Sequence, residues 1–241
     1  MLARIRSVST AEATPPGLAP LPWQGTPEQL QALEQLRTRM SKNGQECPNE
    51  DTLKWYLRDR YFDVDEAEEK LAATLKWRHA FKADHITLED VKAEYATGKS
   101  FVHDQLDNFQ RPVLIIRANR HNPSDFPIEG SKRLCVYSLE TALAKLPAGR
   151  EQILGCIDLR GISLSNIDLV FVAFMVDAFF VHYPRRMGQV LLVDAPWIFK
   201  APWELIKPLL RKYAALVRFV SRKELAAEYF TPDSLPTDFR S

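Results

Sequence analysis

The stretch Ile153-Leu154-Gly155-Cys156-Ile157-Asp158 decides the fold, because it stays apolar on consecutive residues until its last position. Similar runs occur elsewhere in the chain, and longer segments with helical patterning separate them. The other runs are 113–116, 190–193 and 217–220, the helical segments are 130–146, 165–183 and 202–213, and Phe101-Val102-His103 is a candidate edge strand. Strands that are apolar on both faces and alternate with helices indicate an α/β domain with a mostly parallel sheet and flanking helices.

The region before this domain has only helical signals. Residues 1–26 are rich in proline and predict a disordered leader. Thr26-Pro27-Glu28 supplies an N-cap, a proline at the first helical position and an acidic first turn. Asp63 is a candidate cap of a later helix, and no strand pattern interrupts this region. The expected parts are a leader at 1–26, an N-terminal helical bundle at 27–98 and the α/β domain at 99–241.

The charge of the chain is nearly balanced, with 32 basic and 31 acidic residues and a formal net charge of +1. This balance argues against a dedicated nucleic-acid-binding protein, which normally has a strong basic excess. The charges are nevertheless segregated. Residues 181–223 contain nine basic and two acidic side chains, whereas residues 46–70 contain nine acidic and four basic ones. A positive end of this kind favours contact with an anionic surface.

The helix expected after Ser165 differs from an ordinary packing helix, which has one apolar stripe and one polar face. Residues 169–176 are apolar without interruption, and 178–181 continue that character. Such a helix must be shielded on every side, by protein or by a bound molecule. It is therefore either a central core helix or the wall of an apolar pocket. In the second case the candidate ligand-binding side chains are Phe171, Phe174, Met175 and Phe179.

A second unusual helix is expected to begin at Pro202 and to break near Pro208. Pro202 suits the first helical position, but Pro208 has no N–H to bond to the preceding turn, so the helix should last barely two turns. Trp197, Phe199 and Trp203 gather at its start. A short, aromatic-rich segment bounded by prolines is typical of a lid or of a segment that touches a membrane. A surface helix with inward-facing aromatic side chains fits the pattern equally well.

Several motifs, taken in order, resemble those of one family. They are Leu57-Arg58-Asp59-Arg60-Tyr61-Phe62-Asp63 and its continuation to Ala67, Lys76-Trp77-Arg78, Gln110-Arg111-Pro112-Val113, 157–163, Tyr183-Pro184-Arg185-Arg186-Met187-Gly188, 193–199 and 203–210. Over about residues 49–240 the chain resembles the CRAL-TRIO lipid-binding and lipid-transfer family. The resemblance implies a helical bundle followed by a sheet and helices that enclose a lipid in an apolar pocket behind a movable gate helix. The gate residues would be Trp197, Phe199, Trp203, Leu205, Ile206, Leu209 and Leu210.

The chain departs from the family pattern at the headgroup positions. Phosphatidylinositol-transfer members have a glutamate after the Tyr-Pro pair, where this chain has Arg185. The remaining inositol and choline positions correspond to Tyr61, Val217 next to Arg218, Ile153 and Gly155. The resemblance therefore does not extend to those headgroups, and a small anionic headgroup or an uncharged apolar ligand is expected instead. Arg185 with Arg186 is a candidate phosphate clamp, because guanidinium groups bind phosphate bidentately. Local ion pairs are the alternative role for both.

Part of the resemblance points to a compartment. Leu146-Pro147-Ala148-Gly149 and Asp158-Leu159-Arg160-Gly161 are most similar to plant and algal chloroplast members of the family. Residues 1–11 contain the basic and hydroxyl side chains of Arg4, Arg6, Ser7, Ser9 and Thr10, and no acid. We therefore expect a chloroplast protein, peripheral on envelope or thylakoid membranes, with the cytoplasm as the alternative. The leader is either the tail of a transit peptide or simply disordered.

Nothing in the sequence indicates catalysis. It has no glycine-rich phosphate loop, no His-Glu-x-x-His and no Gly-x-Ser-x-Gly, and its five histidines lack metal-ligand spacing. The cysteines Cys47, Cys135 and Cys156 show no disulfide framework, which favours a reducing compartment. Asp158 and Asp194 follow strands, where a hydrolase could place an acid or base, but turn capping is the simpler role. No catalytic residue, metal or cofactor is expected beyond a bound lipid.

The expected function is to hold a hydrophobic ligand, such as phosphatidic acid or a phosphoinositide, in the gated cavity and to exchange it at anionic membranes. The docking residues would be Lys207, Arg211, Lys212 and Arg218. A lipid-sensing scaffold that binds an isoprenoid or other lipid without net transfer is the main alternative, and a lipid hydrolase a lesser one. Expected partners are lipid and membrane, not nucleic acid, and a monomer is favoured.

Overall fold

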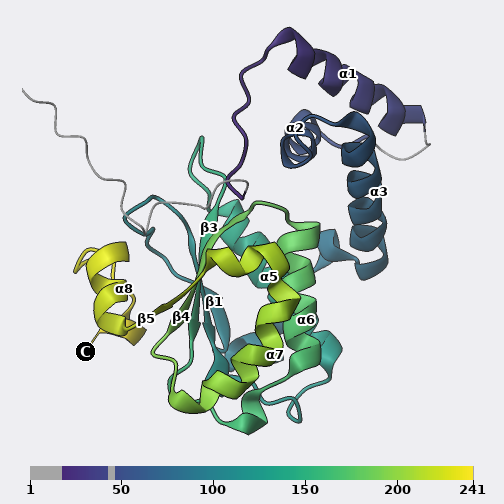
Figure 1. Cartoon of the computed structure of the whole chain (residues 1–241). Coiled ribbons are helices and arrows are strands. Elements are labelled where there is room, and N and C mark those ends of the chain that lie inside the picture. The colour runs from purple at the N-terminus through teal and green to yellow at the C-terminus, as the bar shows by residue number, and fades with distance from the viewer. Residues whose placement is uncertain (1–17, 43–46, 241) are drawn as a thin grey trace, which may run out of the picture.

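The N-terminal bundle consists of three helices. The computed structural model describes residues 18–42 and 47–240, so most of the expected leader lies outside the described residues. The helices are α1 (Pro27–Lys42), α2 (Glu50–Asp59) and α3 (Val64–Phe81), and Figure 1 shows them standing together above the sheet. Asp63 caps α3 by accepting a hydrogen bond from the Glu66 N–H at 2.9 Å, as its position in the sequence predicts. Their core includes Leu33, Leu36, Met40, Leu53, Tyr56, Leu57, Ala67 and Leu71.

The fourth helix, α4 (Leu88–Ala96), packs on α5 (Ile128–Ala144), a helix of the sheet domain. Glu94 of α4 accepts a hydrogen bond from Ser131 Oγ at 2.8 Å and pairs with the buried Lys99. Gly130 makes this approach possible, because a Cβ atom there would lie 2.2 Å from Glu94 Oε1. The helix that the sequence places at the end of the bundle, before residue 98, thus packs on a helix of the sheet domain. The reason is a buried polar contact made across 37 residues, which local patterning does not reveal.

The sheet has the strand order β1-β2-β3-β4-β5. The strands are β1 (Ser100–Val102), β2 (Val113–Arg117), β3 (Ile153–Asp158), β4 (Met187–Val193) and β5 (Val217–Val220). β1 is antiparallel to β2, with Phe101 opposite Ile115, and the other neighbours are parallel, with Cys156 opposite Leu191. The α/β class and the mostly parallel sheet expected from the apolar runs are confirmed.

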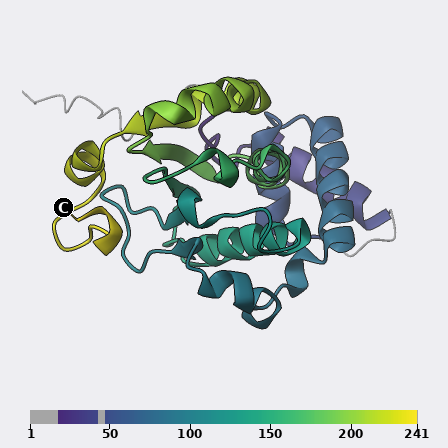
Figure 2. The same cartoon turned by 90° about the horizontal axis from the view of Figure 1, so that it is seen from below.

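The order of the parallel strands explains why one face of the sheet carries the helices. Each of β2, β3 and β4 leads through a helix to its immediate neighbour, and right-handed crossovers in one direction place every such helix on the same face. These helices are α5, α6 (Leu169–Asp177) and α7 (Lys200–Leu210). Figure 2 shows α6 end-on between α5 and α7. The ligand site is therefore expected between this face of the sheet and the helical layer.

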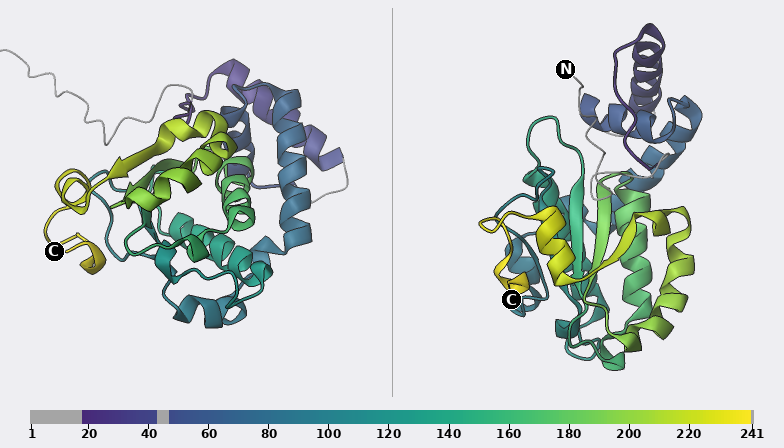
Figure 3. Two further views of the ribbon diagram at one scale, coloured as in Figure 1. Left: turned by 60° about the horizontal axis from the view of Figure 1, so that its bottom comes forward. Right: turned by 60° about the vertical axis from the view of Figure 1, so that its left-hand side comes forward.

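The opposite face of the sheet is closed by the C-terminal segment. The right panel of Figure 3 shows α8 (Arg222–Tyr229) across the sheet from α6 and α7. Its Ser221–Glu224 capping box forms as the sequence predicts. The apolar core on this side contains Val113, Ile115, Leu154, Cys156, Leu191, Val193, Val220, Leu225, Tyr229, Phe230 and Phe239. Alternate strand residues thus supply this core, which leaves the other set of side chains to face the helical layer.

Two helices differ from their expected form. The segment 165–183 is interrupted: α6 ends at Asp177, and Ala178–His182 forms a turn of π-helix, a local widening found often at functional sites. The gate helix α7 starts two residues before Pro202 and keeps Pro208 inside its last turn, ending at Leu210. A proline near the C-terminal end costs only one backbone hydrogen bond, so the helix continues past it before ending.

Candidate ligand-binding cavity

An apolar cavity of about 130 Å³ lies between the sheet and helices α6 and α7. Strands β2 to β5 form its floor, and the two helices form its wall and cover. The polar or ionisable residues in its lining are His121, Asn166 and Asp168, all at the end where β2 and β3 finish. Its apolar lining includes Ile116, Ile157, Val190, Leu192 and Val217 from the sheet and Val172, Val176 and Phe180 from the α6 segment.

Three of the four candidate pocket residues on α6 and the π-helical turn after it line this cavity. They are Phe171, Met175 and Phe179. Phe174 points elsewhere and packs against Phe81 of α3, with ring centroids 5.6 Å apart. The pocket-wall reading of this helix therefore fits better than the reading of a central core helix.

The expectation that α6 is shielded on every side is wrong. Val170 is 66% exposed and Leu169 is 39% exposed, so one apolar side of the helix meets solvent. The physical reason is its position in the layer. α6 has α5 and α7 as lateral neighbours, the cavity beneath it and Phe81 of α3 against Phe174, but its first turn stays exposed. The apolar residues of α6 therefore face two different surfaces, the enclosed cavity on one side and solvent on the other.

Helix α7 and the turn before it, Trp197–Phe199, have the same two-sided character. Phe199, Trp203, Ile206 and Leu210 line the cavity. Trp203 also packs edge-on against Phe219 of β5, at 5.1 Å between ring centroids. The other predicted gate residues face outward, and their exposed fractions are 89% for Trp197, 60% for Leu205 and 39% for Leu209. α7 thus separates an apolar interior from a second apolar surface on the outside.

The cavity is smaller than a long-chain lipid requires. An apolar protein cavity of about 150 Å³ accommodates one benzene molecule. A cavity of about 130 Å³ is therefore too small for a lipid with long acyl chains, and ligand sites for such molecules are several times larger. Displacing α7 outward is the simplest way to enlarge it, because α7 is its outermost cover.

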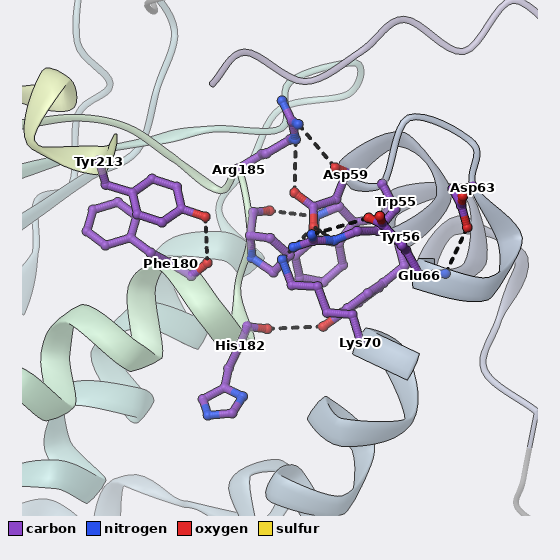
Figure 4. Close-up of polar contacts among 12 residues, drawn as sticks. Trp55, Tyr56, Asp59, Asp63, Glu66, Lys70, Phe180, His182, Arg185 and Tyr213 are labelled. Carbon is purple, nitrogen blue, oxygen red and sulfur yellow. Dashed lines mark hydrogen bonds and ion pairs between the residues drawn. The ribbon is translucent and has the colours of Figure 1, made fainter. Parts of the chain in front are cut away.

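The predicted phosphate clamp does not line the cavity. Arg185 is buried at the junction with the bundle, where its Nε donates to Asp59 Oδ1 at 2.9 Å and its terminal nitrogens donate to the Asp59 and Ala19 carbonyls. Figure 4 shows the side chain directed at Asp59. Arg186 lies over the Trp55 ring at 4.1 Å and donates to the Glu151 carbonyl. Two roles were considered for these arginines, phosphate binding and local pairing. In the structure both arginines make local contacts.

Of the four remaining headgroup positions, Val217 lines the cavity and the other three lie away from it. Tyr61 is 59% exposed on the turn between α2 and α3, and its ring lies 5.2 Å from the Arg185 guanidinium. Ile153 is fully buried at the start of β3. Gly155 faces Met187, and a Cβ atom there would meet the Met187 sulfur at 3.3 Å. Neither Ile153 nor Gly155 is in the cavity lining, so a direct ligand contact of these residues stays a prediction.

The predicted docking residues fall into two groups. Lys207, Arg211 and Lys212 are exposed at the end of α7 and, within the described ranges 18–42 and 47–240, form no ion pair. Arg218, in contrast, donates to Glu228 Oε2 at 3.0 Å and to the Tyr229 hydroxyl at 2.6 Å. The first group leaves its charge available to an outside partner, whereas Arg218 is neutralised by its neighbour.

The two acids considered for a catalytic role, Asp158 and Asp194, both make local contacts. Asp158 accepts hydrogen bonds from the backbone and guanidinium of Arg160, at 2.6 to 3.1 Å. Asp194 likewise accepts from the Arg222 N–H at 3.0 Å and from its guanidinium. Both are loop-capping contacts, the simpler of the two roles considered for them. No group of histidine, cysteine and acidic side chains suited to a metal ion occurs among the described residues. Nor does any described helix have the length and apolarity needed to cross a membrane.

Sequence reasoning missed His121, the most distinctive polar side chain of the cavity. Its ring stacks on Phe171 at 4.9 Å, and its Nε2 lies 3.6 Å from Asp168 Oδ2. Burial, followed by the nearby charge of Lys99, lowers the pKa of His121 below its usual value. A single histidine in a loop has no spacing pattern, and the only available signal was its place just after an apolar strand.

Comparison with known proteins agrees with this architecture. The family model for the CRAL/TRIO domain matches residues 95–239. The chain belongs to the CRAL-TRIO family. A CRAL-TRIO domain-containing protein of Schizosaccharomyces pombe, C3H8.02, is 31% identical over 194 residues, which cover 76% of this chain and 44% of the relative. The SEC14 cytosolic factor of Yarrowia lipolytica is 31% identical over 219 residues, 83% of this chain and 44% of the relative.

Two further comparisons complete the picture of this CRAL-TRIO protein. The phosphatidylinositol transfer protein CSR1 of Eremothecium gossypii is 26% identical and covers 76% of the chain. The crystal structure of Sfh5 superposes with a TM-score of 0.69 at 13% identity, over 87% of this chain and 85% of that one, which shows the shared fold. The chain spans less than half the length of each curated relative named here. These relatives are fungal, so the closeness to chloroplast members is not supported.

Proposed function

We propose that this CRAL-TRIO protein carries a hydrophobic ligand in the cavity between its sheet and α6 and α7, and exchanges it at anionic membranes. The observation that carries the proposal is the two-sided gate helix. Trp203 and Ile206 cover an apolar cavity, while Trp197 and Leu205 present apolar surface to the outside. A helix that is apolar on both sides suits a cover that moves from protein into a lipid surface.

The names of the relatives support the transfer part of this proposal. One is a phosphatidylinositol transfer protein and another a SEC14 cytosolic factor. Burial of acyl chains supplies ample affinity, at about 0.8 kcal/mol for each CH₂ group removed from water. Selectivity must then come from the few polar groups in contact with the ligand and from the shape of the cavity.

Docking is assigned to the cationic end of α7. Lys207, Arg211 and Lys212 follow the cavity-covering turns directly, so a membrane that attracts them also meets the outer face of the gate. Each such cation contributes about 1 kcal/mol near an anionic bilayer, and the contribution falls with salt. The segregation of basic residues into 181–223 thereby orients the protein with its gate towards the surface.

We propose a wider range of ligand headgroups than the anionic one that the sequence predicts. An anionic phospholipid such as phosphatidic acid or a phosphoinositide was expected from Arg185 and Arg186. For Arg185 to bind phosphate, its buried ion pair with Asp59 would have to break, which leaves Asp59 with Lys70 and Arg60 as its partners. Hydrophobic ligands with and without an anionic headgroup are therefore the two outcomes to separate.

Transfer between vesicles tests the proposal. Donor vesicles containing pyrene-labelled phosphatidylcholine, phosphatidic acid or a pyrene-labelled alcohol are mixed with anionic acceptor vesicles, and loss of excimer emission is followed. We expect protein-dependent transfer that slows when Ile206→Asp places a charge on the cavity side of the gate. Binding to vesicles without transfer of any probe would favour the lipid-sensing scaffold instead. Organic extraction and mass spectrometry of the purified protein then identify its native ligand.

The compartment is a separate proposal. A chloroplast location, with the cytoplasm as the alternative, rests on the composition of the basic, hydroxyl-rich leader. Fusing residues 1–26 to a fluorescent protein and following import into isolated plastids tests it, and retention outside the organelle would favour the cytoplasm.

A further inference from the structure

His121 combines deep burial with unused hydrogen-bonding capacity. Its side chain is 10% exposed, and within residues 18–42 and 47–240 neither ring nitrogen has a hydrogen-bond partner. Buried polar atoms are almost always bonded, because an unbonded one costs free energy. His121 lines the apolar cavity, so a ligand in that cavity can reach the ring. A molecule bound in the cavity could therefore form the hydrogen bonds that the two ring nitrogens of His121 lack.

The position of His121 is fixed by its surroundings. Its ring stacks on Phe171 at 4.9 Å, and the Asn166 amide donates to its backbone carbonyl at 2.8 Å. Asp168, 14% exposed, uses Oδ1 to cap α6 by accepting from the Phe171 N–H at 2.9 Å. Its Oδ2 lies 3.6 Å from His121 Nε2, beyond a normal hydrogen bond. Two polar atoms thus face each other across a gap at the end of the cavity.

The charges around this gap favour an uncharged group. The cavity lining contains one acid, Asp168, and no lysine or arginine. The nearby Lys99 is paired with Glu94 and donates to Ser131 Oγ at 3.0 Å, so its charge is compensated within the protein. The lowered pKa of His121 keeps the imidazole neutral at pH 7, with one donor and one acceptor nitrogen. An anionic group here would face the Asp168 carboxylate in an apolar setting.

We propose that His121 and Asp168 form a recognition site for a single uncharged hydroxyl at the end of an otherwise apolar ligand, that is, for a lipid alcohol. A hydroxyl can donate to the Asp168 carboxylate and accept from the imidazole N–H at the same time. Its apolar remainder then extends along Phe171 and Met175 beneath the gate. This inference rests on the proposed function and specifies the ligand class for the same cavity.

The site lies where open α/β sheets place their ligands. His121 follows the carboxyl end of β2 by way of the turn at Ala118–Arg120, and Asp168 follows β3. The carboxyl ends of parallel strands meet at one edge, which brings these two loops together. Because Asp168 also starts α6, a ligand held here is fixed to the first turn of the cavity wall rather than to the movable gate.

Matched ligands test the proposal directly. Nile red, an uncharged reporter of apolar sites, is bound to the full-length protein and displaced by 1-dodecanol, dodecyl methyl ether, dodecanoate or dodecyl phosphate. We expect 1-dodecanol to displace it at least about tenfold more tightly than the ether, which cannot donate, and more tightly than either anion. Equal displacement by alcohol and ether would overturn the proposal. Strongest displacement by dodecyl phosphate would replace it with a phosphate site.

Substitutions assign the preference to the two side chains. His121→Phe keeps the stacking on Phe171, and Asp168→Asn keeps an oxygen to cap α6. Each is expected to bring alcohol and ether within about twofold of each other. Met175→Leu, a lining change without polar atoms, should shift both ligands in parallel. The imidazole ¹⁵N resonances of His121, assigned with the His121→Phe variant, should move with 1-dodecanol and stay in place with the ether.

The outcomes distinguish this inference from the function on which it rests. If no dodecyl compound displaces Nile red from the wild-type protein, the carrier function fails. If all of them displace it equally and His121→Phe changes nothing, the carrier function stands and the hydroxyl site is refuted.

Discussion

Arg185 donates from Nε to Asp59 Oδ1 at 2.9 Å, and this buried pair joins the sheet domain to the end of α2. Burial alone would raise the pKa of Asp59, but Lys70, Arg60 and Arg185 together hold it below its usual value. The neighbouring loop adds a hydrogen bond from Trp55 Nε1 to the Pro184 carbonyl at 2.7 Å. The bundle is thereby fixed to the segment that follows the π-helical turn.

Removing one partner of this pair should destabilise the protein. Arg185→Gln is expected to lower the free energy of unfolding by about 2–3 kcal/mol, less than for an isolated buried charge because Lys70 still pairs with Asp59. Urea denaturation measures the change. If Arg185 instead serves mainly as a phosphate clamp, Arg185→Gln would leave the urea midpoint unchanged and weaken binding of phosphatidic acid.

The outer face of the gate should bind membranes through its exposed apolar side chains. Leu205→Ala is expected to weaken binding to anionic vesicles by about three- to tenfold, because about 1 kcal/mol or more of apolar burial is lost. Leu30→Ala is the matched control, since Leu30 is similarly exposed, at 52% against 60%, but lies on α1 of the bundle. Vesicle sedimentation compares the two. Equal losses for both variants would argue against docking through α7.

The cationic end of α7 should provide the salt-dependent part of docking. Replacing Lys207, Arg211 and Lys212 together by glutamine is expected to reduce vesicle affinity at low salt by roughly tenfold or more, and to flatten its dependence on ionic strength. Arg218→Gln serves as the comparison and should have a smaller effect, because Glu228 already neutralises this arginine. Docking that ignores both salt and anionic lipid content would refute this model.

Acid should weaken the junction between bundle and sheet domain through His182. Its ring stacks on Trp77 at 3.9 Å, and burial, then the charges of Lys70 and Arg78, lower the pKa of His182 to about 4. The unfolded chain therefore binds a proton near pH 6.5 that the folded chain does not bind until about pH 4. This contribution to stability is complete above pH 6.5 and falls as pH drops towards 4.

The slope can reach at most about 1.4 kcal/mol per pH unit and is reduced by the partial exposure of the ring. Urea midpoints of the wild-type protein and of His182→Phe, measured between pH 7 and pH 4, give the contribution by difference. Parallel pH profiles for the two proteins would show that His182 has no such role.

Local patterning was enough to predict the fold. Strands β2 to β5 fall on the four apolar runs because a strand buried on both faces must be apolar at consecutive positions. Caps such as Asp63 depend on residues three positions apart and could be read directly. The sequence predicted a helix at the position of α7, but it could not show which apolar residues of that helix face inward, since both of its faces are apolar.

The missing parts depend on contacts between distant residues. Arg185 stands where the family pattern has a glutamate, and its partner Asp59 is 126 positions away. Neither of the two sequence motifs that contain these residues shows the pairing by itself. The hydrogen bond between Glu94 and Ser131, which holds α4 against α5, likewise joins residues that are far apart in the sequence. His121 becomes notable only once Phe171 and Asp168 surround it, because a lone histidine has no pattern of its own.

In the proposed carrier, the inward face of α7 and of the turn before it would also determine how long a cargo is retained in water. Exposing Phe199, Trp203, Ile206 and Leu210 to solvent would cost roughly 6–12 kcal/mol, at about 1.5–3 kcal/mol for each large side chain. Spontaneous opening away from a bilayer is therefore rare, with an open population of roughly 1 in 10⁴ or less. A bilayer that receives these side chains removes most of that cost, so leakage into water and delivery to a membrane differ by orders of magnitude in rate without any chemical trigger.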